Sequence, residues 1–304
     1  MNIAVIGCGA MGSVYAALLV SAGHRVCVVG PASEHLQTIR ENGLRVTGAS
    51  GDRRVYPKVA SMLPENNWDL IVLAVKAGAV REAVHQLRGI TRETLVVTLQ
   101  NGLGSADVVA EVVDPDQLIV GIAQGFGAAR VAPGHVHHND MKAIRMGPYA
   151  DLTAQRVQAI ADTWQEAGFD AAAVDNIEAM QWEKLICNVA YSAPCALSGL
   201  SVGEVMHDQY LGEVSRMAAC EAFEVAQALA IPLSFDDPVA WVRDFASRMP
   251  DALPSVLQDI RARRVSEVSV INGSIPVEAA KVDLQAPVNK TLTALVQGIE
   301  ATFE

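Results

Sequence analysis

Short apolar runs alternate with helical patterns along the first half of the chain. The runs NIAVI and RVCVV, at 2–6 and 25–29, are followed by further apolar runs at 69–75, 94–99, 117–123, 135–138 and 143–147. Between several of them apolar residues recur at helical spacing, and a helix at 151–167 with a strand at 170–174 ends this region. Strands that alternate with helices in this way predict an α/β fold with a doubly wound, parallel sheet.

The pattern changes from Asn176 onward, where strand-like runs nearly vanish. Long amphipathic runs take over, separated by prolines and glycines, and they lie at 176–190, 207–230, 237–248, 255–271 and 288–302. Runs of this kind, bounded by Pro and Gly, are typical of helices. The sequence therefore predicts two domains, an α/β domain over 1–174 and an all-helical domain over 175–304.

Composition narrows the class of protein. The chain has 304 residues, of which 51% are hydrophobic and 5% aromatic, as expected for a helix-rich α/β enzyme. Its 23 basic and 34 acidic residues give a net charge of −11. This charge argues against nucleic acid as a partner, because phosphate binding needs a basic surface. An anionic small molecule stays compatible with it, since a few local donors suffice to bind one.

Cysteine content and the lack of long apolar runs bear on the compartment. The five cysteines are odd in number and include no C-x-x-C pair, which is typical of buried thiols in a reducing cytoplasm. No apolar run approaches the ~20 residues of a membrane helix, and the N-terminus lacks the basic segment of a signal peptide. We therefore expect a cytoplasmic protein that binds a small molecule and no membrane. A homodimer is left open.

A glycine-rich segment follows the first apolar run. Residues 7–12 read GCGAMG, a G-x-G-x-x-G motif after a strand, at the start of a helix and ahead of a second strand. In such a Rossmann-type unit the first glycine makes the turn, the second lets the backbone approach a pyrophosphate, and the third lets helix and strand pack closely. The motif predicts a dinucleotide site, with a structural turn as the alternative, formed by Gly7, Cys8, Gly9, Ala10, Met11 and Gly12.

The end of the second strand bears on which dinucleotide binds. An acidic residue there would bind the ribose 2′-hydroxyl of NAD, and an arginine would bind the 2′-phosphate of NADP. The chain has Gly30-Pro31-Ala32-Ser33, so neither signature is present. The missing carboxylate removes a repulsion, and the Ser33 hydroxyl is able to donate to a phosphate. This slightly favours NADP (NADPH) and does not exclude NAD.

A lysine in the helical region is the first candidate for chemistry. Reduction of a ketone by a nicotinamide requires a donor to the carbonyl oxygen as negative charge develops there. Lys184, in WEKLICN, is such a donor, and Asn188 lies at i+4 on the same helix face. Ser192 lies one turn further if the helix extends that far. Taken alone, a lysine on a helix is more often a solvated surface charge.

Five segments together resemble the ketopantoate reductase (2-dehydropantoate 2-reductase) family. They are GCGAMG, LAVKAGAV, VVTLQNGLGS, WEKLICN and SVLQDIRARRVSEVSVINGSIP, in the family's order and over nearly the whole chain. The resemblance implies a Rossmann domain joined to a helical domain. It also implies NADPH-dependent reduction of a 2-oxo acid such as ketopantoate, and a role in pantothenate biosynthesis.

The resemblance further implies roles for single residues. Lys184 matches the family's general acid, and Glu267 matches the acidic residue that hydrogen-bonds the substrate hydroxyl. Ser255 matches the serine that contacts the substrate carboxylate, and Asn188 matches an asparagine that lines the substrate pocket.

Lys76 and Asn101 match residues beside the nicotinamide and the substrate in that family. Both follow apolar runs, so they fall at carboxyl ends of predicted parallel strands, where open α/β sheets bind ligands. Other interpretations stay open. Asn-Gly at 101–102 is a common turn dipeptide. Glu267, on a predicted helix with arginines three and four residues before it, also fits a surface ion-pair face.

The chain departs from the family pattern at three positions. Ser192, in YSAPCALSG, stands where the family has a second pocket asparagine, and Val202 stands where it has a polar residue. Pro31 replaces the arginine expected after the second strand. The groups matched to the reaction remain while those that select the substrate differ. A 2-oxo acid other than ketopantoate is therefore left open.

Two alternatives stay beside this function. A relative of the β-hydroxyacid dehydrogenases, which also use a lysine near an asparagine, would oxidise a 3-hydroxy acid. Ser255 and Glu267 argue against it. A non-catalytic NADP(H)-binding sensor is the second alternative, and it would have no use for the matched residues.

Two further groups of residues are interpreted as structural. His135, His137 and His138 have no acidic or cysteine partner at metal-ligand spacing, so we predict no metal site. Cys187 and Cys195 have no neighbouring histidine that would make either a nucleophile, so we expect core thiols.

Overall fold

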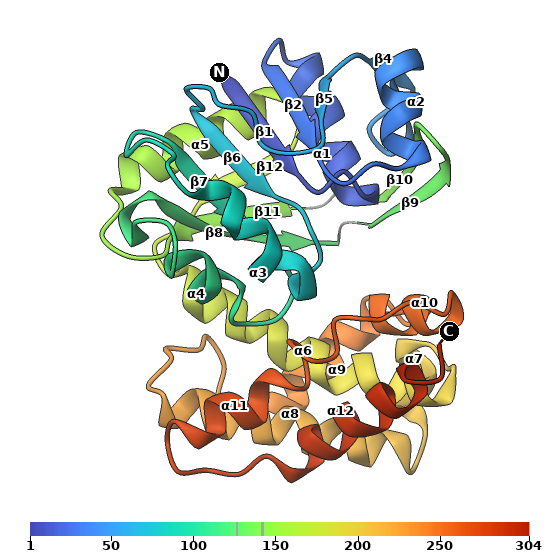
Figure 1. Cartoon of the computed structure of the whole chain (residues 1–304). Coiled ribbons are helices and arrows are strands. Elements are labelled where there is room, and N and C mark those ends of the chain that lie inside the picture. Colours follow the sequence, from blue (N-terminus) through green and yellow to red (C-terminus); the bar gives the residue numbers. More distant parts are fainter. Residues whose placement is uncertain (126, 141–142, 304) are drawn as a thin grey trace. The chain divides into compact units, whose positions relative to one another are not determined.

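A computed structural model describes residues 1–125, 127–140 and 143–303 of the chain, which forms two compact units (Figure 1). The first unit comprises Met1–Gln100 and Ser105–Ile177. The second comprises Asn101–Gly104 and Glu178–Glu304, so a short segment that follows a strand of the first unit groups with the second.

The first unit is built on an eight-stranded sheet in the order β12-β11-β8-β7-β6-β1-β2-β5. Its neighbouring strands run parallel except β11, which is antiparallel to β8. The strands are β1 (Asn2–Ile6), β2 (Arg25–Val29), β5 (Lys58–Ala60), β6 (Leu70–Leu73), β7 (Leu95–Thr98), β8 (Leu118–Gln124), β11 (Ala143–Pro148) and β12 (Asp170–Ala173).

Helices cover both faces of this sheet. They are α1 (Ala10–Ser21), α2 (Glu34–Asn42), α3 (Val80–Ala83), α4 (Ser105–Ala110) and α5 (Ala154–Glu166), with the 3-10 turns η1 (Ala77–Ala79), η2 (Val84–Leu87) and η3 (Pro115–Gln117). Ile3 and Val5 of β1 belong to one hydrophobic cluster, while Ala4 and Ile6 belong to another. Successive strand side chains point to opposite faces, so β1 is buried on both sides, as expected of a doubly wound sheet.

A second, four-stranded sheet corrects part of the predicted topology. It runs in the order β4-β3-β10-β9, with the strands β3 (Leu44–Gly48), β4 (Arg53–Val55), β9 (Gly127–Ala132) and β10 (His135–Asp140). The run at 135–138 therefore leaves the main sheet, where a strand was predicted. The run at 143–147 joins the main sheet, but antiparallel to β8.

The second unit is helical, as predicted. Its helices are α6 (Ile177–Ser198), α7 (Val202–His207), α8 (Leu211–Ala228), α9 (Pro238–Ser247), α10 (Ser255–Arg261), α11 (Ser274–Ala280) and α12 (Pro287–Glu300). They enclose one hydrophobic cluster, in which Val202 is buried. Across the described ranges, no helix combines the length and the apolar character needed to cross a membrane.

The predicted helix at 255–271 is wrong in its second half. α10 ends at Arg261, and Arg263 adopts φ of 50°, which an α-helix does not tolerate. The N–H of Arg264 closes the end by donating to the carbonyl of Asp259 over 2.9 Å. Glu267 therefore lies in a turn segment and not on a helix face with the two arginines, and the guanidinium of Arg264 pairs with Asp259 instead.

Candidate active site

The glycine loop joins β1 to α1 in the first unit. α1 begins at Ala10, and the N–H of Ser13 donates to the carbonyl of Gly9 over 3.0 Å. A Cβ at Gly12 would collide with the carbonyl oxygen of Gly7, whereas nothing lies within 4 Å of the Cβ position at Gly9. The third glycine is thus required for packing, and the second leaves an open approach to the backbone. This geometry fits a pyrophosphate at the N-terminus of α1.

The segment after β2 leads directly into α2. Ser33 is the N-cap residue of α2, and its hydroxyl oxygen accepts the N–H of Leu36 over 3.3 Å. This bond uses a lone pair of the hydroxyl and not its hydrogen. Glu34, the first residue of α2, adds a carboxylate beside it, and the side chains of residues 31–34 are exposed.

Two strand ends of the first unit carry long polar side chains. Lys76 follows β6 and is exposed at the N-cap position of η1. Gln100 follows β7, and its Nε2 donates to the carbonyls of Leu73 and Val75 over 2.8 and 3.0 Å. Gln100 thereby ties the ends of β6 and β7 together. Sequence patterns did not single it out, although its place after an apolar run is the same signal that selected Lys76.

Three predicted site residues meet in the second unit. Nζ of Lys184, near the middle of α6, donates to Oδ1 of Asn101 over 2.9 Å. Nδ2 of Asn101 donates to Oε2 of Glu267 over 3.0 Å. Because the ammonium only donates and the carboxylate only accepts, these contacts fix the orientation of the amide. A half-buried cation and a half-buried anion are thus joined through one amide.

The loop that carries Asn101 is held in the second unit by hydrogen bonds to its backbone. The N–H of Leu103 donates to the carbonyl of Val270 over 3.0 Å, and Nε2 of Gln181 donates to the carbonyl of Gly102 over 3.2 Å. Gly102 has φ of +77°, and a Cβ there would collide with the carbonyl of Val270. Asn101 thus belongs to the array, within a segment of bends at 101–104. Gln181 was missed, although its place three residues before Lys184 on α6 puts it on the same face.

Burial and a nearby carboxylate shift the pKa of Lys184 in opposite directions. Burial lowers the pKa of Lys184 from 10.5 to about 8, and the nearby carboxylate of Glu267 raises it in opposition. A lysine with such a pKa exchanges its proton near neutral pH, whereas an exposed lysine stays charged. Because Lys184 is half-buried and its ammonium donates to Asn101, it is not a solvated surface lysine.

In the part of the chain that the structure describes, the other residues matched to substrate binding lie outside this hydrogen-bonded array. α6 continues through Pro194 to Ser198, so Asn188 and Ser192 follow Lys184 on one helix, half-buried and buried respectively. Ser255 is exposed as the first residue of α10.

A buried asparagine also braces the helix that bears Lys184. Nδ2 of Asn272, a residue with no exposed surface, donates to the carbonyl of Val189 and to Oδ1 of Asn289, both over 2.9 Å. A carbonyl of α6 thus has a side-chain donor close to Pro194, whose missing N–H interrupts the helical hydrogen bonding.

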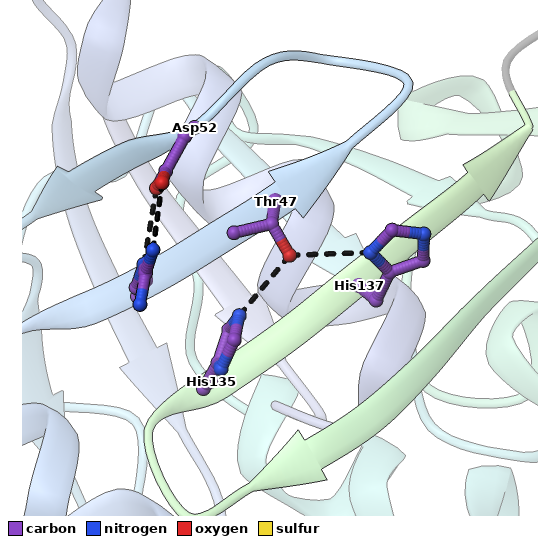
Figure 2. Close-up of polar contacts among 5 residues, drawn as sticks. Thr47, Asp52, His135 and His137 are labelled. Atoms are coloured by element: carbon purple, nitrogen blue, oxygen red, sulfur yellow. Dashed lines mark hydrogen bonds and ion pairs between the residues drawn. The ribbon is translucent and has the colours of Figure 1, made fainter.

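His135 and His137 of β10 both contact Thr47 of the neighbouring strand β3 (Figure 2). Oγ1 of Thr47 lies 3.1 Å from Nε2 of His135 and 3.2 Å from Nδ1 of His137. His138 points to the other face, where its Nδ1 lies 3.1 Å from Oγ of Ser50. Among the residues that the structure describes, no cluster of three or more metal-ligating side chains is found.

The two cysteines of α6 are core residues. Cys187 and Cys195 belong to the hydrophobic cluster of the second unit, and burial raises the pKa of each thiol to about 12. Thiols with such pKa values do not form the thiolate that a nucleophile requires.

One unit has a glycine loop at the start of a Rossmann-type sheet, and the helical unit has a half-buried lysine linked to a carboxylate through an amide. These features are typical of the class of nicotinamide-dependent oxidoreductases. Known sequences narrow this class. Residues 3–151 match the sequence model described as ketopantoate reductase PanE/ApbA, and residues 176–300 match that of the C-terminal part of the same proteins. The chain belongs to the ketopantoate reductase family.

Individual relatives agree with this family. A protein of Halobacterium salinarum named 2-dehydropantoate 2-reductase is 32% identical over 299 residues, which is 98% of each chain. A PanE/ApbA family ketopantoate reductase from Ralstonia eutropha superposes with a TM-score of 0.88 at 29% identity, covering 99% of each chain. A D-mandelate dehydrogenase solved with NADH and anilino(oxo)acetate superposes with a TM-score of 0.91 at 25% identity, covering 100% of this chain and 99% of that one. The protein is thus an NAD(P)H-dependent oxidoreductase resembling 2-dehydropantoate 2-reductase.

Proposed function

We propose that the protein reduces a 2-oxo acid to the 2-hydroxy acid with NADPH, and that Lys184 is the general acid. The hydrogen-bonded array of Lys184, Asn101 and Glu267 carries this proposal. An ammonium has three hydrogens, and Asn101 takes one of them. We assign another to the ketone oxygen of the substrate, which gains negative charge as the ketone is reduced. A pKa of about 8 suits this task, because a general acid is most effective when its pKa lies near the working pH.

Glu267 and Asn101 keep the lysine ready to donate. Burial lowers the pKa of Lys184 and Glu267 raises it. At the resulting pKa of about 8, the Lys184 side chain is protonated in most molecules at neutral pH. Asn101 holds the ammonium in one place. Its amide also links the ammonium to the Glu267 carboxylate, because it accepts from Lys184 and donates to Glu267. We also assign to Glu267 a hydrogen bond from the substrate hydroxyl. The lysine regains its proton from solvent after each turnover.

The glycine loop is proposed as the place where the cofactor binds, with the region 1–174 as the dinucleotide-binding domain and 175–304 as the substrate-binding domain. The bound nicotinamide supplies the hydride. The chain supplies backbone N–H groups at the start of α1 for the pyrophosphate, and Lys76 and Asn101 beside the nicotinamide. The open side of Gly9 supports this fit, since a ligand is able to approach the backbone there.

The substrate is proposed to be held by Asn188, Ser192 and Ser255. A solved neighbour named D-mandelate dehydrogenase contains anilino(oxo)acetate, a 2-oxo acid derivative with an aromatic substituent. Ser192 is matched to a position where the family resemblance implies a pocket asparagine, so a long polar group is replaced there by a short one. Both points favour a 2-oxo acid with a larger or less polar substituent than ketopantoate has.

NADPH is proposed as the preferred cofactor, by a small margin. The hydroxyl hydrogen of Ser33 is not used in capping α2 and is able to reach a 2′-phosphate. The carboxylate of Glu34 acts against this preference, because it repels a phosphate at the same helix end. We therefore expect a kcat/KM ratio below about tenfold between NADPH and NADH, which corresponds to less than about 1.4 kcal/mol.

A panel of 2-oxo acids assayed with NADPH and NADH tests the proposal. The panel includes ketopantoate and phenylglyoxylate, and 3-hydroxy acids are assayed in the oxidative direction. We expect turnover of at least one 2-oxo acid that is lost in Lys184→Met and kept in Lys281→Met, which removes an exposed lysine of the same unit. Turnover of 3-hydroxy acids alone would identify a β-hydroxyacid dehydrogenase, and cofactor binding without any turnover would identify a sensor. Either result contradicts the proposal.

A further inference from the structure

A buried chain of polar side chains runs through the first unit behind the glycine loop. The N–H of Gly134, in the turn between β9 and β10, donates to Nδ1 of His35 over 3.0 Å. Nε2 of His35 lies 3.1 Å from Oγ of Ser13, which lies 3.4 Å from Sγ of Cys8. His35 is 3% exposed and Ser13 is 0% exposed, so neither exchanges these partners for water.

The backbone N–H of Gly134 fixes the direction of the first two hydrogen bonds. A backbone N–H only donates, so Nδ1 of His35 accepts, and the neutral ring carries its proton on Nε2. Nε2–H of the neutral ring therefore donates to Oγ of Ser13, and either the Ser13 hydroxyl or the Cys8 thiol donates in the contact between them. Burial lowers the pKa of His35 and the charge of Arg130 on β9 lowers it further, while a hydrogen bond with the backbone of Ala132 raises it, so the net shift favours the neutral ring. Burial raises the pKa of Cys8 to about 11, so the chain ends in an uncharged thiol inside the loop.

The hydrogen bonds from Gly134 to Cys8 connect four segments of the first unit. Cys8 belongs to the glycine loop, and Ser13 belongs to the first turns of α1. His35 stands two residues after Ser33, at the start of α2. The turn at Gly134 packs on α2, since a Cβ there would lie 2.7 Å from Cγ2 of Thr38. Figure 1 shows α2 and the β9–β10 hairpin close together in this unit.

We propose that His35 and Ser13 are positioning residues that hold the glycine loop and the start of α2 in the geometry required to bind the dinucleotide. The proposal rests on the proposed function, in which this loop takes the pyrophosphate. A loop whose donors are already aligned loses little conformational freedom when the ligand binds. A loop that has lost the hydrogen bonds of His35 and Ser13 must instead be ordered by the ligand itself. An uncharged thiol at Cys8 also avoids repulsion of the phosphates.

Dinucleotide affinity measured by protein fluorescence titration with NADPH and with NADH tests this role. We expect His35→Leu to weaken both cofactors alike, by about five- to twentyfold, because one buried hydrogen-bonded chain is lost. At saturating cofactor, kcat and the KM for the 2-oxo acid should stay unchanged. His35→Gln, which keeps a donor and an acceptor in one amide, should restore most of the affinity.

Matched variants separate positioning from loss of stability. Ile39→Ala removes a core side chain of α2 that is 1% exposed and lies outside the polar chain, so it should lower stability and leave both dissociation constants unchanged. Ser13→Ala should weaken binding as His35→Leu does, and the double variant should weaken it no further. Ser13→Ala also reports on the same chain if His35→Leu does not fold.

The outcomes distinguish this inference from the proposed function. A wild-type protein that binds neither NADPH nor NADH would overturn the cofactor site itself. A wild-type protein that binds, with His35→Leu and Ser13→Ala binding equally well, would overturn the positioning role alone. Equal weakening by Ile39→Ala, or additive effects in the double variant, would also overturn it.

Discussion

Replacing Glu267 by Gln is expected to move the alkaline limb of the kcat profile to lower pH. The pKa of Lys184 is about 8 because burial lowers it and Glu267 raises it. Hydrogen bonds of 2.9 and 3.0 Å on either side of the Asn101 amide keep the two charges within about 8 Å. At an effective dielectric constant of about 20, unit charges at that separation interact by about 2 kcal/mol, or roughly 1.5 pKa units. Partial exposure of the array reduces this to about one unit.

The sign follows from which form of Lys184 donates. Removal of the neighbouring negative charge disfavours the ammonium, so its pKa falls and the acid form is lost at lower pH. We expect the limb near pH 8 in the wild type and near pH 7 in Glu267→Gln. The assay is kcat from pH 6 to 10 at saturating 2-oxo acid and cofactor. Glu278→Gln, which removes the carboxylate of an ion pair with Lys281, is the control and should not move the limb. An unchanged limb in Glu267→Gln, or one displaced to higher pH, would refute the electrostatic argument.

Three further substitutions test the contacts of the second unit. Lys184→Met should be more stable than the wild type at pH 7 by about 1–3 kcal/mol in urea unfolding, because a pKa of about 8 in place of 10.5 means that burial of the charge costs stability. That difference should shrink as the pH rises from 8 to 10.5, and a constant difference would contradict it. Gly102→Ala should lower kcat at least tenfold, since its Cβ collides with the carbonyl of Val270 and displaces the array. Gly104→Ala, with φ of +88° but nothing within 4 Å, should cost stability alone, so equal losses of kcat would refute the argument. Asn272→Ala should lower the free energy of unfolding by about 1–3 kcal/mol, and an unchanged urea midpoint would show that its buried hydrogen bonds do not stabilise α6.

The central strands and the glycine loop could be predicted from the sequence because their signals are local. β1 and β2 coincide with the apolar runs at 2–6 and 25–29, and the glycines between them specify a turn into a helix. The four-stranded sheet could not be predicted, because its strands are short or polar. β9, with four exposed residues in six, offers no apolar run, and the direction of β11 depends on contacts between segments distant in sequence.

Helix ends were harder to predict than helices. The apolar residues Val268 and Ile271 continue a helical spacing beyond α10 and are buried, but they reach the core from turns. The left-handed conformation of Arg263, which ends that helix region, has no sequence signal such as glycine.

The hydrogen-bonded array of Lys184, Asn101 and Glu267 could not be predicted from local sequence patterns. Lys184 and Asn188 share a helix, which spacing alone predicts. Asn101 lies 83 residues from Lys184 and 166 from Glu267, so only the resemblance to a known family brought the three together before the structure did. Asn101 in particular followed a strand of one unit and was found grouped with the other.

The central claim is that Lys184 donates the proton in reduction of a 2-oxo acid, and the turnover of Lys184→Met tests it most directly. With the best 2-oxo acid of the panel at saturation, kcat should fall by roughly 10²–10⁴, the usual loss when a general acid is removed. The dissociation constants of NADPH and NADH should stay within about twofold of the wild-type values, because the lysine is not assigned to cofactor binding. A variant that keeps near-wild-type kcat would contradict the account.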